Sequence, residues 1–221
     1  MTSDSTFPLR LTEIDDLTRP DHSYLEPADK CYFIGEYTAR KGFAYSPGNR
    51  LIINFKKPMD RRGTPQWPWK EHWLQQAARA FRTALNKEFL DVATFVPVPP
   101  SKAKTDPLYD DRMTRMLQAI RPQAPIDVRE LIVQTESTAA AHDRSDRLSP
   151  AELEAMYRID EAVKLPAPSV IAICDDMLTT GSHFRAAQRV LQQAFPGVRI
   201  LGLFIVRRVP EAVDFPDLED E

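Results

Sequence analysis

The apolar residues of this 221-residue chain follow two patterns that alternate along the sequence. Short apolar runs predict strands, whereas segments with an apolar residue at every third or fourth position predict helices. Strands are expected at 31–37, 51–55, 93–98, 128–133, 170–174 and 198–206, and helices at 69–87, 108–120, 150–157 and 184–194. This alternation predicts an α/β fold with a mainly parallel central sheet flanked by helices.

Turn residues mark the boundaries between these elements, and with 19 prolines against seven glycines they are mostly prolines. Gly48 and Asn49 stand between the first two predicted strands, so 31–37 and 51–55 are expected to form a small antiparallel piece. Residues 1–30 mix prolines with acidic and hydroxyl side chains and predict an irregular N-terminal arm. The acidic segment 211–221 is expected to be a solvated tail, which leaves 31–210 as one domain.

Composition excludes several classes of protein. A formal charge of −3 does not favour broad binding to nucleic acid, which needs a basic surface. Cys31 and Cys174 are far apart in the sequence, so neither a disulfide scaffold nor a zinc cluster is expected, and Cys174 should be a buried thiol. The chain shows no secretion signal and no apolar run of membrane-spanning length. We therefore expect a cytoplasmic protein with no membrane partner.

The strongest chemical signal follows the predicted strand 170–174. Asp175 and Asp176 come directly after it, and a hydroxyl-rich turn then leads into a helix through Thr179, Thr180, Gly181, Ser182 and His183. A helix start offers unpaired N–H groups and the positive end of the helix dipole, which together stabilise a phosphate. Nearby carboxylates accept hydrogen bonds from sugar hydroxyls. The segment therefore predicts a ribose-5-phosphate site; the alternative is a strand-turn-helix unit with acidic surface residues and no ligand.

This segment resembles the phosphoribosyl pyrophosphate (PRPP) signature of the type I phosphoribosyltransferases, a hydrophobic strand followed by Asp-Asp, two residues and Thr-Thr-Gly-x-Thr. The resemblance implies that Asp175 and Asp176 are catalytic, holding the ribose hydroxyls directly or through Mg²⁺. It implies that residues 179–183 bind the 5′-phosphate, although His183 replaces the last threonine. It also implies a type I fold in which the N-terminal part of the 31–210 domain forms a small hood that selects the acceptor.

A second motif, Pro97-Val98-Pro99, follows the predicted strand 93–98 and leads to Ser101 and Lys102. It is similar to the first loop of the ComF-like (competence protein F-like) subgroup of the same family. The resemblance implies that Ser101 and Lys102 bind the pyrophosphate of PRPP. The alternative is that Lys102 and its neighbour Lys104 are solvated loop lysines.

The chain also departs from the ComF-like pattern. Residues 109–113 read Tyr-Asp-Asp-Arg-Met where the subgroup usually has Arg-Gly-Phe-Asn-Gln. The basic residue of the flexible loop is absent at the start of 134–142, although Arg144 and Arg147 follow closely, and no four-cysteine zinc ribbon precedes the domain. The resemblance covers about 51–207 and is strong only at the PRPP signature.

Three functions follow as hypotheses. The first is a cytoplasmic phosphoribosyltransferase, a pentosyl glycosyltransferase of nucleotide metabolism that transfers a phosphoribosyl group to a nitrogenous acceptor with Mg²⁺. The second is a non-catalytic sensor of PRPP or a nucleotide, and the third is a ComF-like component of a DNA uptake, repair or defence assembly. The expected partner is PRPP or a nucleotide, with a homodimer as one arrangement. Nucleic acid is not the expected partner, because the chain lacks a basic surface and the spacing of Trp67, Trp69 and Trp73 favours packing over base stacking. The alternative is that these tryptophans share one groove with Arg61 and Arg62 and bind single-stranded nucleic acid.

Overall fold

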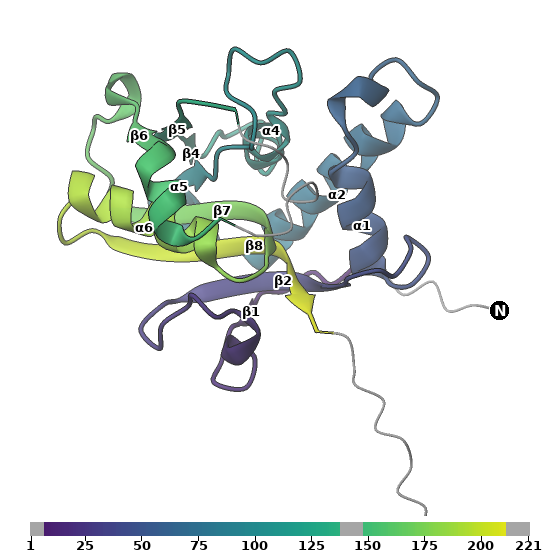
Figure 1. Cartoon of the computed structure of the whole chain (residues 1–221), viewed down its shortest axis with the longest axis horizontal. Coiled ribbons are helices and arrows are strands. Elements are labelled where there is room, and N and C mark those ends of the chain that lie inside the picture. The colour runs from purple at the N-terminus through teal and green to yellow at the C-terminus, as the bar shows by residue number, and fades with distance from the viewer. Residues whose placement is uncertain (1–6, 138–147, 211–221) are drawn as a thin grey trace, which may run out of the picture.

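A computed structural model describes residues 7–137 and 148–210 and has a mixed, mostly parallel six-stranded sheet at its centre (Figure 1). The strand order across the sheet is β1-β2-β8-β7-β3-β4. These strands are β1 (Thr12–Glu13), β2 (Cys31–Thr38), β8 (Arg199–Val209), β7 (Val170–Leu178), β3 (Ala93–Pro97) and β4 (Asp127–Val128). Within this six-stranded sheet of the described residues, only the pair of β1 with β2 is antiparallel. A separate antiparallel pair is formed by β5 (Ile132–Gln134) and β6 (Tyr157–Ile159).

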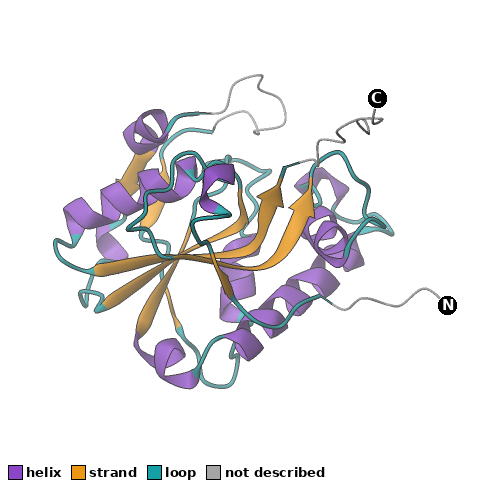
Figure 2. Cartoon of the chain, turned by 90° about the horizontal axis from the view of Figure 1, so that it is seen from below, coloured by secondary structure: helices purple, strands orange, loops and turns teal. Residues whose placement is uncertain are grey.

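Helices cover both faces of the sheet, as the view along its edge shows (Figure 2). One face carries α1 (Pro47–Phe55), α2 (Trp67–Ala84), α3 (Lys87–Val92) and α4 (Arg112–Gln118). The other carries α5 (Pro150–Met156) and α6 (Ser182–Ala194). Short 3-10 turns η1 (Arg19–Asp21), η2 (Met59–Arg61) and η3 (Glu161–Val163) lie in the connections. No helix within 7–137 and 148–210 is both long and apolar enough to cross a membrane.

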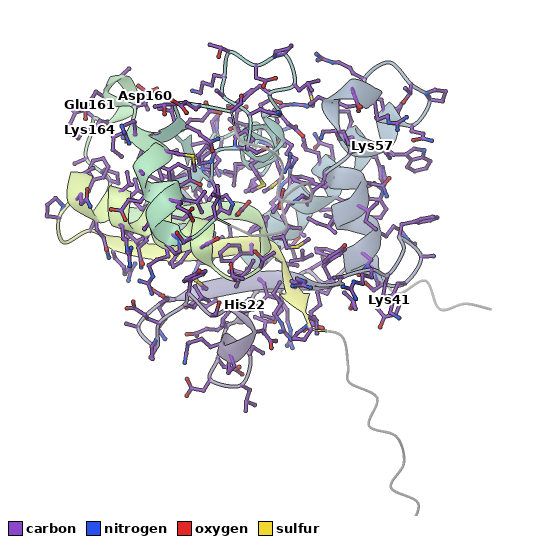
Figure 3. All side chains as sticks on the ribbon, in the orientation of Figure 1. His22, Lys41, Lys57, Asp160, Glu161 and Lys164 are labelled. Carbon is purple, nitrogen blue, oxygen red and sulfur yellow. The ribbon has the colours of Figure 1, made fainter. Side chains whose placement is uncertain are left out.

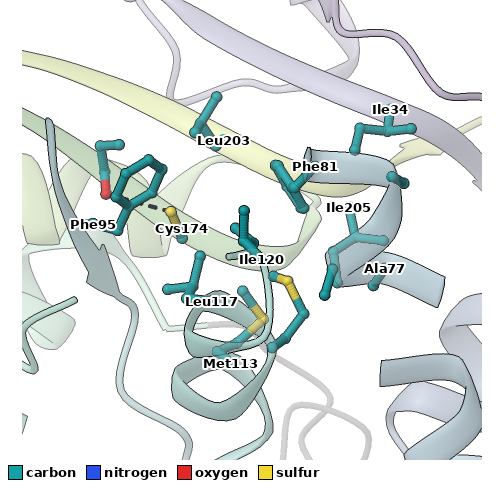
Figure 4. Close-up of a cluster of buried hydrophobic side chains, with 14 of the residues drawn as sticks. Ile34, Ala77, Phe81, Phe95, Met113, Leu117, Ile120, Cys174, Leu203 and Ile205 are labelled. Carbon is teal, nitrogen blue, oxygen red and sulfur yellow. Dashed lines mark hydrogen bonds between the residues drawn. The ribbon is translucent and has the colours of Figure 1, made fainter. Parts of the chain in front are cut away.

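Each face of the sheet has its own hydrophobic core. Toward α1, α2 and α4 the core contains Phe81, Phe95, Leu117 and Ile205, all fully buried (Figure 4). Toward α5 and α6, a second core is formed by other buried apolar side chains, which include Phe184 and Phe204. Burial of each such side chain contributes about 1.5–3 kcal/mol, so the two cores hold β7 firmly between two layers of helices.

Several predicted elements are confirmed. The strands at 31–37, 93–98 and 198–206 correspond to β2, β3 and β8, and the helices at 69–87, 150–157 and 184–194 to α2, α5 and α6. Both cysteines are buried and free, and burial raises the thiol pKa of Cys174. The arm is mostly irregular within 7–30, although it includes β1 and η1. The predicted tail 211–221 lies outside the described residues.

The prediction of a strand at 51–55 is wrong, because this segment belongs to α1, and so the predicted antiparallel piece with 31–37 does not form. The Ser46 hydroxyl accepts a hydrogen bond from the Asn49 N–H at 3.0 Å, and Pro47 occupies the first helical position, both typical of a helix start. Gly48 is required there, because a Cβ would lie 1.9 Å from the Glu36 carbonyl oxygen of β2. Gly48 was expected in a turn, but it is a glycine because α1 packs closely against β2 at this position.

Other boundaries also differ from the prediction. The strand expected at 128–133 is two short strands, β4 and β5, in different sheets, and the helix expected at 108–120 begins only at Arg112. The helix expected at 69–87 ends at Ala84, after which Asn86 caps α3. Strand β7 continues four residues beyond the predicted 170–174, because it stays paired with β8 as far as Leu178.

Candidate functional site

The two predicted loops lie at one edge of the sheet. Strands β3 and β7 are parallel neighbours with Pro97 opposite Cys174, and the Val98 N–H donates to the Cys174 carbonyl at 2.8 Å. The loop that carries Ser101 and Lys102 therefore leaves the sheet beside Asp175. Carboxyl ends of parallel strands are where ligands gather in open α/β sheets. This topology brings together the motifs that the sequence separates by more than 70 positions.

Asp175 and Asp176 do not follow the strand, as the sequence suggested, but belong to β7. Neighbouring strand residues point to opposite faces of a sheet, so the two carboxylates lie in different surroundings. Asp176 is buried and accepts from the Lys56 ammonium at 2.9 Å and from the Arg112 guanidinium at 3.0 and 2.6 Å. Asp175 is partly exposed and accepts a hydrogen bond from the Asp176 N–H at 2.7 Å.

The ion pairs of Asp176 extend into a longer buried chain. Arg112 also donates to Asp110 at 2.7 Å, and Asp110 accepts from the Lys70 ammonium at 2.7 Å. Lys70 is fully buried, and burial lowers its pKa while Asp110 opposes that change. Sequence reasoning noted Asp110 and Arg112 only as a departure from a family pattern. The residue types were visible, but nothing in their spacing linked them to Asp176.

Burial and charge drive the two adjacent carboxyl pKa values apart. For Asp175, burial together with the negative charge of Asp176 raises the pKa to about 7. For Asp176, burial acts in the same direction, but Lys56 and Arg112 outweigh it and hold the pKa below its usual range. Asp176 is therefore a fixed anion, and Asp175 is the carboxyl that changes charge near neutral pH.

A buried tyrosine lies near Asp175 and contacts a histidine in turn. The Tyr157 side chain is buried, and burial, together with the charge of Asp175, raises its pKa. Its hydroxyl forms a 2.8 Å hydrogen bond with Nδ1 of His183. The His183 imidazole is thus oriented by a side chain from β6.

The turn after β7 keeps the features of an anion site. Gly181 precedes α6 with a φ of 85°, a left-handed conformation that favours glycine, and no side chain within 7–137 or 148–210 caps this helix start. The Thr180 hydroxyl is buried without a hydrogen-bond partner among the described residues. A phosphate at a helix start needs unoccupied donors of this kind.

The N-terminal arm fastens the other side of this turn. His22 lies in this arm (Figure 3). Its Nδ1 forms a hydrogen bond with the Thr179 carbonyl, and the Tyr24 N–H donates to the Thr180 carbonyl at 2.9 Å. The Arg185 guanidinium then joins α6 to the arm through the Tyr24 carbonyl at 3.2 Å. The arm therefore contacts carbonyl oxygens of the turn, a support that the sequence did not reveal.

The predicted pyrophosphate residues lie in the loop after β3. The Ser101 carbonyl accepts from the Gln134 amide at 3.1 Å, while the Lys102 ammonium lies 3.9 Å from the Asp106 carboxylate. Lys104 is closer to an acid, 2.6 Å from Glu130. Both lysines thus face carboxylates in this structure. His142, Arg144 and Arg147 lie outside the described residues.

The arrangement as a whole offers hydrogen-bond donors for a phosphate and a carboxylate acceptor for hydroxyls at one sheet edge. Among the described residues, no cluster of three or more His, Cys, Asp or Glu side chains could hold a metal ion without help from a ligand. No protein-family model matches the sequence, and no curated protein is significantly similar to it.

Proposed function

We propose that this chain is a phosphoribosyltransferase on a type I fold, which binds PRPP and transfers its phosphoribosyl group to a nitrogenous acceptor with Mg²⁺. The observation that carries the proposal is the glycine-preceded start of α6, beside the partly exposed Asp175. Among the described residues, no side chain caps this helix start and the Thr180 hydroxyl has no hydrogen-bond partner. This pairing suits a sugar that carries both a phosphate and free hydroxyls. The N-terminal third would then supply the hood over the acceptor.

In this proposal the two aspartates act differently. Asp175 accepts hydrogen bonds from the ribose hydroxyls, since its carboxylate is partly exposed. A carboxylate has about four acceptor positions, and Asp176 already uses three of them for Lys56 and Arg112. Asp176 therefore acts mainly by keeping β7 and its neighbours in place.

The transfer itself asks little covalent chemistry of the protein. A lone pair of the acceptor nitrogen forms the new bond to the anomeric carbon, the bond to pyrophosphate breaks with its electron pair, and the proton of the acceptor passes to water. Residues 179–183 fix the 5′-phosphate, and Ser101 and Lys102 neutralise the departing pyrophosphate, so catalysis rests on positioning and charge stabilisation.

Mg²⁺ fits this donor set in one way. The ion commonly uses one or two protein carboxylates and takes its remaining ligands from substrate phosphates and water. Asp175 is the suitable protein ligand, through water or the ribose hydroxyls, because Lys56 and Arg112 already neutralise Asp176. When bound, the ion would balance the charge of the pyrophosphate.

A PRPP or nucleotide sensor without turnover is the second candidate. It is favoured by the contacts of Lys102 and Lys104 with Asp106 and Glu130, which reduce the positive charge available to a leaving pyrophosphate. The two candidates share the same binding site and differ only in turnover.

Calorimetry with PRPP and Mg²⁺ tests the proposal, followed by pyrophosphate release against a panel of bases. Asp175→Asn should weaken PRPP binding at least tenfold at pH 8, whereas Asp60→Asn, at an exposed acid on η2, should not change it. Release with one base identifies the enzyme, and binding without release identifies the sensor. If the unaltered protein does not bind PRPP, both candidates are wrong.

A further inference from the structure

A pocket of about 250 Å³ opens beside the turn, at the ends of β2 and β8. Its walls include Thr179 and Thr180 from the turn, Arg40 after β2, Arg208 near the end of β8 and Asp21 from η1. The loop with Ser101 and Lys102 follows β3, on the other side of β7. The turn thus separates the pocket from the predicted pyrophosphate loop.

Two adjacent arginines of β8 have very different surroundings. Arg207 is buried, donates to Glu36 at 2.6 Å and to Asp21 at 2.9 Å, and lies over the Phe33 ring. The Arg208 guanidinium, within 7–137 and 148–210, has no hydrogen-bond or ion-pair partner. The pocket therefore contains an arginine charge that the described protein does not neutralise, while the one acid in its wall is already paired.

Two buried polar atoms near the pocket also have no partner in the described chain, the Thr180 hydroxyl oxygen and Nε2 of His22. A buried hydroxyl left without a hydrogen bond costs about 1–3 kcal/mol, so such groups usually meet a ligand or water. Burial lowers the pKa of His22 and so favours the uncharged form of this ring. Arg208 is then the source of positive charge in the pocket wall that the described residues do not neutralise.

The backbone holds Arg40 in an uncommon conformation. Its φ is 60°, the only positive value among the non-glycine residues of the described chain. Such a conformation costs roughly 1–3 kcal/mol and persists only where surrounding structure imposes it. The wall of the pocket is thus shaped by the fold.

We propose that this pocket binds the acceptor through an anionic group, a carboxylate or a phosphate, which pairs with Arg208. The assignment to an acceptor rests on the proposed function. An acceptor must attack the anomeric carbon from the side opposite the departing pyrophosphate, and the pocket lies on that side of β7. A guanidinium suits this role because its fork of N–H groups matches the two oxygens of a carboxylate or phosphate.

The test compares charged and uncharged probes by calorimetry on the full chain, with ribose 5-phosphate and Mg²⁺ present. The carboxylate arm uses a pyridine carboxylate against its carboxamide, and the phosphate arm uses a nucleoside monophosphate against its nucleoside. We expect one charged probe to bind about tenfold or more tightly than its uncharged partner, and the arm that shows this identifies the source of the anion.

Arg208→Gln should remove this preference, whereas Arg199→Gln, at the opposite end of β8, should retain it. Thermal unfolding of both variants shows whether they are folded. Equal binding of charged and uncharged probes by the unaltered protein overturns the proposal, and so does a preference that survives in folded Arg208→Gln.

A separate titration distinguishes failure of this inference from failure of the proposed function. Ribose 5-phosphate should bind Arg208→Gln and the unaltered protein equally, and a tenfold loss in the variant would assign the pocket to the sugar phosphate and overturn the proposal. If neither PRPP nor ribose 5-phosphate binds the unaltered protein, the proposed function is wrong. The anion site is then retained only if the charge preference, measured without ribose 5-phosphate, still depends on Arg208.

Discussion

The two faces of β7 give its two neighbouring aspartates very different environments. On the face toward α1 and α4, Asp176 is one of five charged residues in a chain of ion pairs with Lys56, Arg112, Asp110 and Lys70, of which the three residues Asp176, Asp110 and Lys70 are buried. On the face toward α5 and α6, Asp175 is partly exposed near a tyrosine. Identical side chains one position apart can therefore serve as a fixed structural anion and as a titratable group available to a ligand.

The difference follows from the neighbours of each face. Burying a carboxylate is unfavourable unless cations and hydrogen bonds compensate, and the first face supplies an ammonium and a guanidinium. On the second face no cation pairs with Asp175 among the described residues, and the hydrogen bond that it accepts comes from the backbone N–H of Asp176. Asp175 thus retains acceptor capacity that Asp176 has largely used.

The largest expected effect is on stability, at Asp176. Asp176→Asn leaves Lys56 and Arg112 without their shared anion in a buried site and should lower the free energy of unfolding by about 3–5 kcal/mol. Urea denaturation at pH 7 measures the change. Asp60→Asn is the control, since its exposed pair with Arg61 is worth less than about 1 kcal/mol. Similar small losses in both variants would show that the buried chain does not stabilise the fold.

The next effect is at Asp175, where substitution should raise the free energy of unfolding instead of lowering it, by an amount that depends on pH. Its folded pKa of about 7 lies above the ordinary 3.8, so the unaltered protein loses stability as the pH rises from about 4 through 7. Asp175→Asn removes that loss and should raise the free energy of unfolding by ~2 kcal/mol at pH 8, allowing for solvent screening, with little change at pH 4.

Denaturation series at both pH values measure this difference. If Asp175→Asn were less stable than the unaltered protein at pH 8, the fold would stabilise the Asp175 carboxylate. That result would contradict the difference proposed between Asp175 and Asp176. For Asp176 the sign is reversed, because its lowered pKa contributes stability above about pH 4 that is lost as the pH falls further.

The smallest effect concerns the bond between Tyr157 and His183. Tyr157→Phe removes the hydroxyl that contacts Nδ1 of His183 and should cost about 0.5–1.5 kcal/mol of stability. It should also change the NMR chemical shifts of the His183 imidazole, whereas Tyr45→Phe, at an exposed tyrosine, should change neither the stability nor these shifts. Unchanged imidazole shifts in Tyr157→Phe would indicate that the hydroxyl does not orient this ring.

Much of the fold could be predicted from local patterns. The α/β class, the mostly parallel sheet and the helix after β7 follow from apolar periodicity, because one face of each helix and both faces of β7 are buried. The segment 51–55 was misread since a short apolar run suits a strand or a buried helix, and the cap at Ser46 and Pro47 is the signal that distinguishes them. The roles of the PRPP-like residues and of Mg²⁺ stay predictions.

By itself, the sequence determined which segments are apolar enough to form the layers, and it indicated which turn is the candidate for an anion site. Only the tertiary structure decided that β7 extends through both aspartates, because pairing with β8 continues past them. It also decided which cations neutralise Asp176, since Lys56 and Arg112 lie 120 and 64 positions away in the chain. Contacts between such distant residues depend on the packing of helices against a sheet, which no local pattern of residues encodes.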